Sequence, residues 1–235
     1  MKRRHAASRV ELLEDALERQ VLDGRFKPGE HLVETALADE FNVGRNTLRA
    51  AFDGLVRRGL LVKARNRGVF VRALTAHDLS EIYQLRTALE VQASRILATT
   101  RVIPDGAKLA SEIHRQVGAG SPPRVIVEAD LAFHRALVVA TGNTRLMAAH
   151  KNLETEILIC LTQLIQGYAT VGQLAHEHSE LLDAIESGEA DAAETLIRHH
   201  LEGAAAWLVD HVTPPADGAD YPVEEGAAAA SSDLG

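Results

Sequence analysis

The sequence predicts a mainly α-helical fold: a small front domain of helices with one β hairpin, then an all-α bundle of six antiparallel helices. Three observations support this prediction. Aromatic residues make up only 4% of the 235 residues, and Ala and Leu are abundant, which favours helices over sheets. Apolar residues recur at helical spacing over most of the chain. Runs typical of β-strands occur only near residues 60–72.

The front domain is expected to span residues 1–74. A first helix fits residues 8–23, and Gly24, Pro28 and Gly29 then interrupt the pattern. Two short helices on either side of a tight turn follow, and then the strands of a hairpin, at residues 34–41, 45–58, 60–63 and 69–72. Two short helices joined by a tight turn, with arginines on the second, are typical of a helix-turn-helix.

The rear domain is expected to span residues 75–212. Pro and Gly residues interrupt its helical pattern and divide it into six helices, near residues 76–99, 105–118, 122–141, 143–167, 171–187 and 189–212. Six helices of this length can bury a core of their own as an antiparallel bundle. Residues 213–235 lack apolar periodicity, and we expect a disordered tail there.

The formal net charge of −8 is unevenly distributed. Residues 1–74 contain 15 Lys and Arg against 10 Asp and Glu, whereas the rest contains 10 against 23, so only the front domain is expected to approach a polyanion. No apolar run approaches the ~20 residues of a membrane span, and the basic N-terminus lacks an apolar signal core. Cys160 is the only cysteine, which excludes an intrachain disulfide and favours the cytoplasm.

The second short helix carries side chains suited to reading DNA. Arg45 and Arg49 are one helical turn apart and project from the same side, where arginine can bind guanine in the major groove. The hairpin adds basic residues that can reach the minor groove or a phosphate. The predicted DNA-binding residues are Arg45, Asn46, Thr47, Arg49, Lys63, Arg65, Arg67 and Gly68. The alternative is a small helical subdomain with a solvated basic face.

A family pattern runs through the same region, in Pro28–Leu32, Leu37–Ala38, Val43–Arg49, Leu55, Gly59–Leu60 and Arg67–Val71. In these residues the front domain closely resembles the winged helix-turn-helix of GntR-type bacterial transcription regulators. The resemblance implies a homodimer that binds a palindromic operator in double-stranded DNA. Gly44 stands where the family usually has Ser or Thr, Ala50 where it has Glu, and Thr35 where some members have Arg. These departures leave the operator sequence open.

Four polar side chains of the rear domain are expected to point into its core. Asp130 and His134 are one helical turn apart on an apolar face. His178 and His200 lie on the apolar stripes of two further helices, with apolar residues one turn before and one turn after each. By the same spacing, two neighbouring histidines are expected to be exposed, His176 and His199.

The burial of these four groups predicts a metal site. A buried carboxylate without compensation costs several kcal/mol, and three imidazoles add their own desolvation cost. A divalent cation bound by all four would remove the difficulty, and three imidazoles with one carboxylate suit Zn, Ni, Co or Mn, with Zn as the default. Taken singly, each side chain is more often a hydrogen-bonded core residue. The predicted ligands are Asp130, His134, His178 and His200.

Over residues 78–210 the rear domain resembles the FCD effector-binding domain of FadR-type GntR regulators. The resemblance rests on the segments DLAFHRAL…TGNTRL and EHSELLDAIESGEADAAETLIRHHL. Each of the four predicted ligands matches a position of the usual Asp-His-His-His set. A bundle of six helices, instead of seven, is more similar to the branch of the family related to VanR than to FadR itself. The resemblance implies a metal whose open coordination positions take water or a small organic acid.

Two residues are candidates for binding this effector. The guanidinium of Arg86 can hold a carboxylate through two hydrogen bonds, and the alternative is a salt bridge to Glu90, four residues later on the same helix. Asn143 can support the pocket or cap the helix that follows it.

The predicted function is a metabolite-responsive, DNA-binding transcriptional regulator, acting as a repressor and not as an enzyme. We expect a small carboxylic acid as effector and a bacterial cytoplasmic protein that joins the nucleoid when bound to DNA. A regulator that senses the metal itself is one alternative, and a purely structural metal is another. A metal-dependent hydrolase would need a general base, and its candidates, Glu128 and Glu154, lack supporting spacing.

Overall fold

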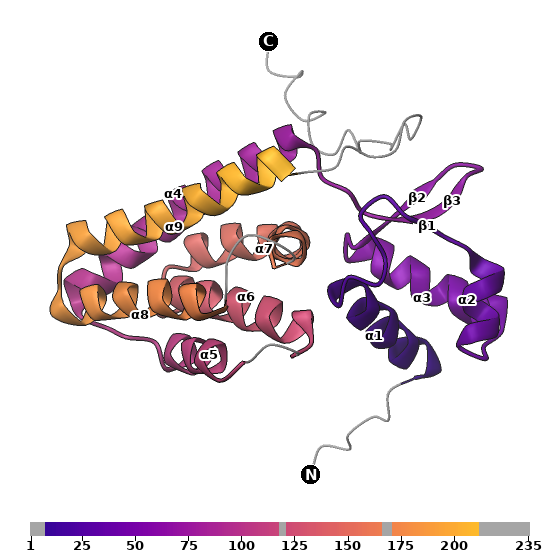
Figure 1. Cartoon of the computed structure of the whole chain (residues 1–235), viewed down its shortest axis with the longest axis horizontal. Helices are drawn as coiled ribbons and strands as arrows, with labels where there is room; N and C mark the ends of the chain where they lie inside the picture. The colour runs from indigo at the N-terminus through magenta and orange to yellow at the C-terminus, as the bar shows by residue number, and fades with distance from the viewer. Residues whose placement is uncertain (1–7, 118–120, 166–170, 212–235) are drawn as a thin grey trace. The chain divides into compact units, whose positions relative to one another are not determined.

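The computed structural model describes residues 8–117, 121–165 and 171–211 (Figure 1). The chain separates into two compact units. One contains residues 27–73 together with the beginning of the first helix, and the other contains residues 16–26 and the described residues from 74 to 211. Because the second half of the first helix is grouped with the rear unit, a single boundary after residue 74 remains a prediction. The expected tail lies outside the described residues.

Residues 8–74 contain the predicted elements in the predicted order. Their helices and strands are α1 (Arg9–Leu22), β1 (His31–Leu32), α2 (Glu34–Glu40), α3 (Arg45–Arg57), β2 (Leu61–Ala64) and β3 (Gly68–Val71). The sheet is antiparallel with the order β1-β3-β2, and Lys63 lies opposite Val69 in the hairpin. Strand β1 was not predicted, because two residues are too few to show an alternating pattern. It forms by pairing with β3, where His31 lies opposite Phe70.

Two glycines shape the surface predicted to contact DNA. Gly68 has a φ of +104°, and a Cβ atom there would lie 2.4 Å from Nε2 of His31, so the hairpin requires glycine at this position. Gly44 is the N-cap of α3, with a φ of −69° and no side chain to accept a hydrogen bond. A Cβ atom at Gly44 would meet no atom within 4 Å, so the backbone and its surroundings leave room for a larger residue there.

The described part of the rear unit is a bundle of six helices, each close to its predicted range. They are α4 (Ala76–Thr100), α5 (Asp105–Gln116), α6 (Pro123–Ala140), α7 (Thr144–Leu164), α8 (Val171–Ser187) and α9 (Ala190–His211). A capping box begins α4: the backbone N–H of Asp78 donates to the Thr75 hydroxyl, and the Thr75 N–H donates back to the Asp78 carboxylate. Helix α4 lies along α9, and α5 packs against α6 (Figure 1).

The core of this bundle is mainly apolar and also contains buried polar side chains. Phe133, Leu137, Ile157, Ile185 and Leu201 are almost completely buried between the helices. The buried polar residues among them are Arg86, Thr87, Glu90, Ser94, Ser111, His114, Asp130, His134, His150 and His178. Such groups require partners. The bundle supplies partners for some of their atoms and leaves others without one among the described residues, including both carboxylate oxygens of Asp130. None of the described helices combines the length and the apolar character needed to span a membrane.

The single cysteine lies in the same core. Cys160 on α7 is buried and free. Burial raises the pKa of its thiol to about 12, so the side chain stays protonated and acts as a small apolar residue.

Candidate metal centre and DNA-contacting surface

Three helices bring the four predicted ligands together. Asp130 and His134 come from α6, His178 from α8 and His200 from α9. One ligand atom of each lies within 4.8 Å of one ligand atom of every other. The first three side chains are at most 3% exposed and His200 is 10% exposed, so the predicted inward orientation is confirmed. The predicted exposure is also confirmed for two histidines, His176 and His199.

Two carboxylates fix the protons of two of these imidazoles. Nδ1 of His134 lies 2.5 Å from Oε2 of Glu90, and Nδ1 of His200 lies 2.6 Å from Oε2 of Glu177. A carboxylate only accepts hydrogen bonds, so both Nδ1 atoms carry the proton and both rings present an Nε2 lone pair when neutral. Nε2 of His134 and Nε2 of His200 are 3.3 Å apart. Two lone pairs therefore face each other.

The third imidazole is oriented by another histidine. Nε2 of His114 lies 3.2 Å from the carbonyl oxygen of Ile126, which only accepts, so this Nε2 carries the proton. Nδ1 of His114 is then an acceptor, and it lies 3.3 Å from Nδ1 of His178. His178 must donate from Nδ1, which leaves a lone pair on its Nε2. That Nε2 is buried and makes no hydrogen bond within the described part of the chain.

The carboxylate of Asp130 completes the cluster. Its two oxygens lie 3.6 Å from Nε2 of His134 and 3.5 Å from Nε2 of His178, and neither accepts a hydrogen bond from any described residue. Burial lowers the pKa of both His134 and His178, so these rings are neutral near pH 7. Four electron-pair donors thus converge without a proton between them. This arrangement fits a divalent cation, and three nitrogens with one oxygen suit a borderline metal.

The sequence analysis did not identify most of the residues that hydrogen-bond to the predicted ligands. Glu90 was singled out only as a family position and as a partner of Arg86, and Glu177 and His114 were not singled out at all. Glu90 also lies 3.4 Å from Nε2 of the buried His150. Burial alone would raise the pKa of Glu90, but His134 and Arg86 hold it well below its usual value. Glu90 is therefore a charged acceptor that orients His134, as carboxylates commonly do for metal-binding histidines.

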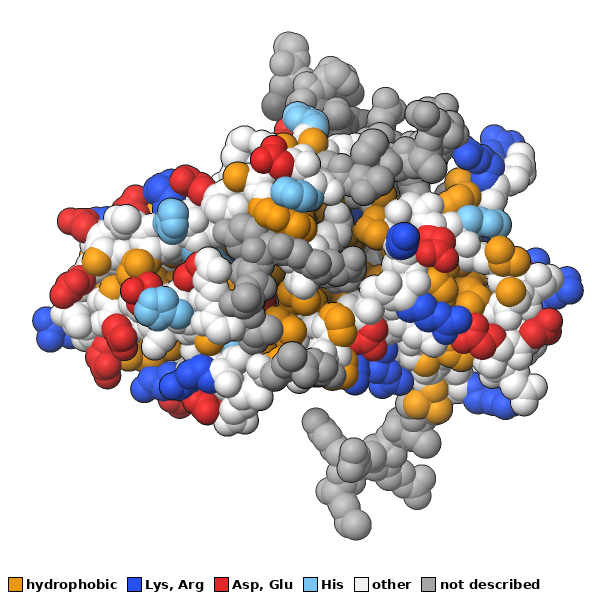
Figure 2. All heavy atoms as spheres, in the orientation of Figure 1, with side chains coloured by type: hydrophobic (Ala, Val, Ile, Leu, Met, Phe, Trp, Pro, Cys, Tyr) orange, Lys and Arg blue, Asp and Glu red, His pale blue; other side chains and the backbone are white. Residues whose placement is uncertain are grey.

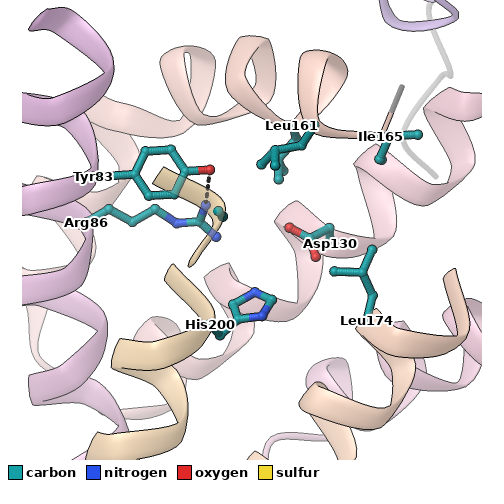
Figure 3. A pocket seen from close by; sticks show the side chains of 9 residues that line it. Tyr83, Arg86, Asp130, Leu161, Ile165, Leu174 and His200 are labelled. Atoms are coloured by element: carbon teal, nitrogen blue, oxygen red, sulfur yellow. Dashed lines mark hydrogen bonds between the residues drawn. The ribbon is translucent and has the colours of Figure 1, made fainter. Parts of the chain in front are cut away.

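A small cavity of about 20 Å³ adjoins the cluster (Figure 3). Its walls are Tyr83, Arg86, Asp130, Leu161, Leu164, Ile165, Leu174, His200 and Ala204. Arg86 forms the salt bridge to Glu90 that was one of its two predicted roles, with 2.7 Å between Nε and Oε1. Its Nη2 is buried and has no hydrogen-bond partner in the described chain, so it remains available to a molecule in the cavity.

Comparison with known proteins identifies both domains. The family described as "Bacterial regulatory proteins, gntR family" matches residues 10–71, and the FCD domain matches residues 81–203, which is more than half of the chain. The chain belongs to the GntR family of transcription regulators. Its rear unit is an FCD domain, so the resemblances found in the sequence are confirmed and the protein is a regulator instead of an enzyme. The closer likeness to the VanR branch stays a prediction.

Similar proteins include named operon repressors. The chain is 29% identical over 195 residues to the "Probable D-xylose utilization operon transcriptional repressor" of Paenarthrobacter nicotinovorans, covering 83% of this chain and 84% of that protein. It is 24% identical over 207 residues to the galactonate operon transcriptional repressor of Escherichia coli (strain K12), covering 76% and 87%. A solved GntR regulator from Rhodococcus sp. RHA1 superposes with a TM-score of 0.72 at 27% identity, covering 88% of this chain and all of that one.

The regulator's winged domain displays most of the predicted DNA-binding residues. Arg45 and Asn46 are exposed at the start of α3, whereas Thr47 is half-buried. Arg49 is exposed but paired, with 2.8 Å between its Nε and Oε2 of Glu34 on α2. The hairpin residues Lys63, Arg65, Arg67 and Gly68 are exposed, and Lys63 lies 3.4 Å from Asp53. Lys and Arg side chains gather over this hairpin in Figure 2.

Of the two predicted roles of Asn143, the structure shows the cap. Its Oδ1 accepts hydrogen bonds from the backbone N–H groups of Arg145 and Leu146 at the start of α7. The side chain is exposed and is not part of the cavity wall beside the cluster. A contact between Asn143 and an effector therefore finds no support in this arrangement.

Replacing His114 by leucine is expected to weaken metal binding. The change removes the acceptor for Nδ1 of His178, so the ring loses the contact that fixes its tautomer. Loss of such a partner typically lowers metal affinity about 10- to 100-fold. His114→Gln should retain part of the affinity, because its amide oxygen can accept the same hydrogen bond. Competition with a chromophoric chelator measures the affinities, and His77→Leu, at an exposed histidine of α4, is the control. Equal affinities for wild type and His114→Leu would contradict the role of His114.

Proposed function

We propose that this GntR regulator represses transcription by binding a palindromic operator as a homodimer, and that a small organic acid bound at a divalent metal in the FCD domain changes its operator affinity. Helix α3 would enter the major groove with Arg45, Asn46 and Thr47, and the hairpin would contact the minor groove or the phosphates. The printed names of two relatives describe operon repressors, which supports repression as the mode of action.

One observation carries the sensing half of this proposal. Three Nε2 lone pairs and the Asp130 carboxylate converge in the core, and the proton on each Nδ1 is held elsewhere. A bound cation would accept a carboxylate oxygen in place of water. Arg86 would hold the acid from α4 with its free Nη2, and Tyr83 supports the guanidinium through its hydroxyl, 3.4 Å from Nη1.

Coupling to DNA requires that the acid bind two conformations of the regulator with different affinity. The ligands and Arg86 come from α4, α6, α8 and α9, so an acid that pulls on both sides of the cavity changes the packing of helix α4, which begins directly after the winged domain. That change would alter how two winged domains fit neighbouring half-sites.

The test combines metal analysis with operator binding. The full-length protein, purified without chelator, is expected to contain one divalent metal per chain and to form a salt-sensitive, sequence-specific complex with DNA upstream of its own gene. Arg67→Ala should weaken that complex and lower its salt dependence, because a phosphate contact is lost. Organic acids should shift the affinity at constant metal content. If operator affinity instead follows metal concentration, the regulator senses the metal; if no specific complex forms, the proposal fails.

A further inference from the structure

We infer that Glu34 is a positioning residue for DNA recognition: it holds the guanidinium of Arg49 in one orientation, so that Arg49 reads a guanine of the operator. This inference rests on the proposed function, in which helix α3 enters the major groove. Glu34 itself contacts no base and acts on the DNA only through Arg49.

Glu34 and Arg49 come from two helices that pack against each other. Nε of Arg49, on α3, donates to Oε2 of Glu34, the first residue of α2, at 2.8 Å. Three apolar side chains of the two helices, Leu37, Leu48 and Phe52, are at most 5% exposed, so the helices have a fixed position relative to each other. The side chain of Glu34 is 29% exposed and that of Arg49 is 58% exposed. The carboxylate is therefore the better supported partner, and the guanidinium is the one that solvent and DNA can reach.

The contact with Glu34 leaves most of the guanidinium for DNA. Arginine has five N–H donors, and the contact that Arg49 makes within the described chain uses the one on Nε. The other four, on Nη1 and Nη2, form the outer edge of the group, and two parallel N–H groups of this edge can bind O6 and N7 of guanine. Arg45, one turn earlier, lies on the same exposed face of α3. Pairing with Glu34 therefore does not withdraw Arg49 from DNA but selects the edge that it presents.

The orientation matters because an exposed arginine side chain has many rotamers. An arginine that must give up this freedom when it binds a base binds that base more weakly. A freely rotating arginine can also bind whichever phosphate it meets, which strengthens binding to every sequence alike. The carboxylate of Glu34 reduces both effects and also repels the phosphates. Glu34 therefore lowers the affinity for DNA in general and raises the preference of Arg49 for one base.

The residue after Arg49 leaves this task to Glu34. Ala50 is exposed on α3 and stands where the family usually has Glu, so position 50 supplies no side-chain acceptor. The surface contains a second pair of opposite charges, in which Nζ of Lys63 lies 3.4 Å from Oδ1 of Asp53. Lysine is a point charge whose three donors rotate, so this pair fixes no orientation toward a base. The carboxylate of Asp53 therefore offers a matched comparison with that of Glu34.

Selection of sequences from random double-stranded DNA by the full-length protein tests the inference. The sequences bound by the wild type define its operator, and comparison with Arg49→Ala identifies the guanine that Arg49 reads. Fluorescence anisotropy then compares this operator, the same DNA with adenine in place of that guanine, and unrelated DNA. The wild type is expected to prefer guanine by about five-fold or more, as a bidentate contact does. Glu34→Ala should lose most of this preference and bind unrelated DNA more tightly, because a negative charge is removed.

Two further variants separate orientation from charge. Glu34→Gln loses the charge but keeps an oxygen that can accept from Nε of Arg49. It should bind unrelated DNA as tightly as Glu34→Ala does and retain part of the preference for guanine. The control, Asp53→Asn, removes the same charge from the same surface and should leave the preference for guanine unchanged. Thermal unfolding of each variant should give temperatures close to that of the wild type, because exposed ion pairs contribute little to stability.

The outcomes separate this inference from the proposed function. If the wild type selects no sequence, the proposed operator binding fails and the inference fails with it. If the wild type selects an operator but Arg49→Ala changes no base preference, or Glu34→Ala keeps the full preference for guanine, the inference is overturned and operator binding stands. A loss of preference at every base in Glu34→Ala, together with a lower unfolding temperature, also overturns it, because Glu34 would then only support the fold.

Discussion

Replacing Asp130 by asparagine is expected to stabilise the metal-free protein and to abolish tight metal binding. In the wild type both carboxylate oxygens are buried and accept no hydrogen bond from the described residues, and they face lone pairs on His134 and His178. An asparagine amide at the same place can donate N–H to one or both of these nitrogens. Satisfying buried acceptors in this way is worth about 1–3 kcal/mol. The variant should therefore unfold at a higher temperature than the wild type when chelator is present.

With added metal, the wild type should instead unfold at a higher temperature than the Asp130→Asn variant. A ligand that binds only the folded state stabilises it by about 4 kcal/mol at a concentration 1,000 times its dissociation constant. The wild type gains this stabilisation, whereas the Asp130→Asn variant offers a neutral amide in place of the carboxylate, and this amide occupies the lone pairs that a cation needs. Thermal unfolding of both proteins in EDTA, and then in excess zinc, measures the reversal.

The matched control for this reversal is Asp191→Asn, at a carboxylate that is 95% exposed and pairs with Arg95. This variant should have the same unfolding temperature as the wild type, both in EDTA and in excess zinc. A lower unfolding temperature of Asp130→Asn in EDTA would mean that Asp130 has favourable partners other than a metal. The proposal of a cation at the cluster would then lose its electrostatic basis.

Helical periodicity was sufficient to predict which four polar side chains point into the core, because each one lies on the apolar stripe of its own helix. The spacing distinguished the buried His178 from the exposed His176, and the nearly buried His200 from the exposed His199. One residue along a helix rotates a side chain by about 100°, so neighbours that look alike in the sequence face different surroundings. The positions of helix breaks followed from Pro and Gly in the same way.

Periodicity could not reveal which residues orient the predicted ligands, because those contacts join different helices. Glu177 precedes His178 in the chain but orients His200, on α9. His114 lies on the buried face of α5 together with Ala107 and Ala110. The small side chains of these two alanines make the apolar stripe of this helix weak. The pairing of His114 with His178 depends on the packing of α5 against α8, which no local pattern encodes. The same reason explains the missed strand β1, which exists only through β3.

Replacing Glu90 by glutamine is expected to lower the free energy of unfolding by about 3–5 kcal/mol, the usual cost of breaking a buried ion pair from one side. Glu90 is fully buried and binds Nε of Arg86 at 2.7 Å and Nδ1 of His134 at 2.5 Å. Glutamine has nearly the same shape, and its amide oxygen can accept from His134. Its amide N–H₂ then faces the Nε–H of Arg86, so a buried guanidinium is left without a counter-charge and against another donor. Urea unfolding measures the loss.

Two further variants identify the cause of this loss. Glu81→Gln, at an exposed glutamate of the same helix that pairs with His77, should leave the stability unchanged. In the double variant Arg86→Met/Glu90→Gln the unpaired charge is gone and the amide no longer meets a donor, so it should recover much of the stability lost in Glu90→Gln. A double variant less stable than the single one would show that Arg86 stabilises the bundle independently of Glu90. In that case Arg86 would serve the packing of α4, and the freedom of its Nη2 would no longer argue for an anionic ligand.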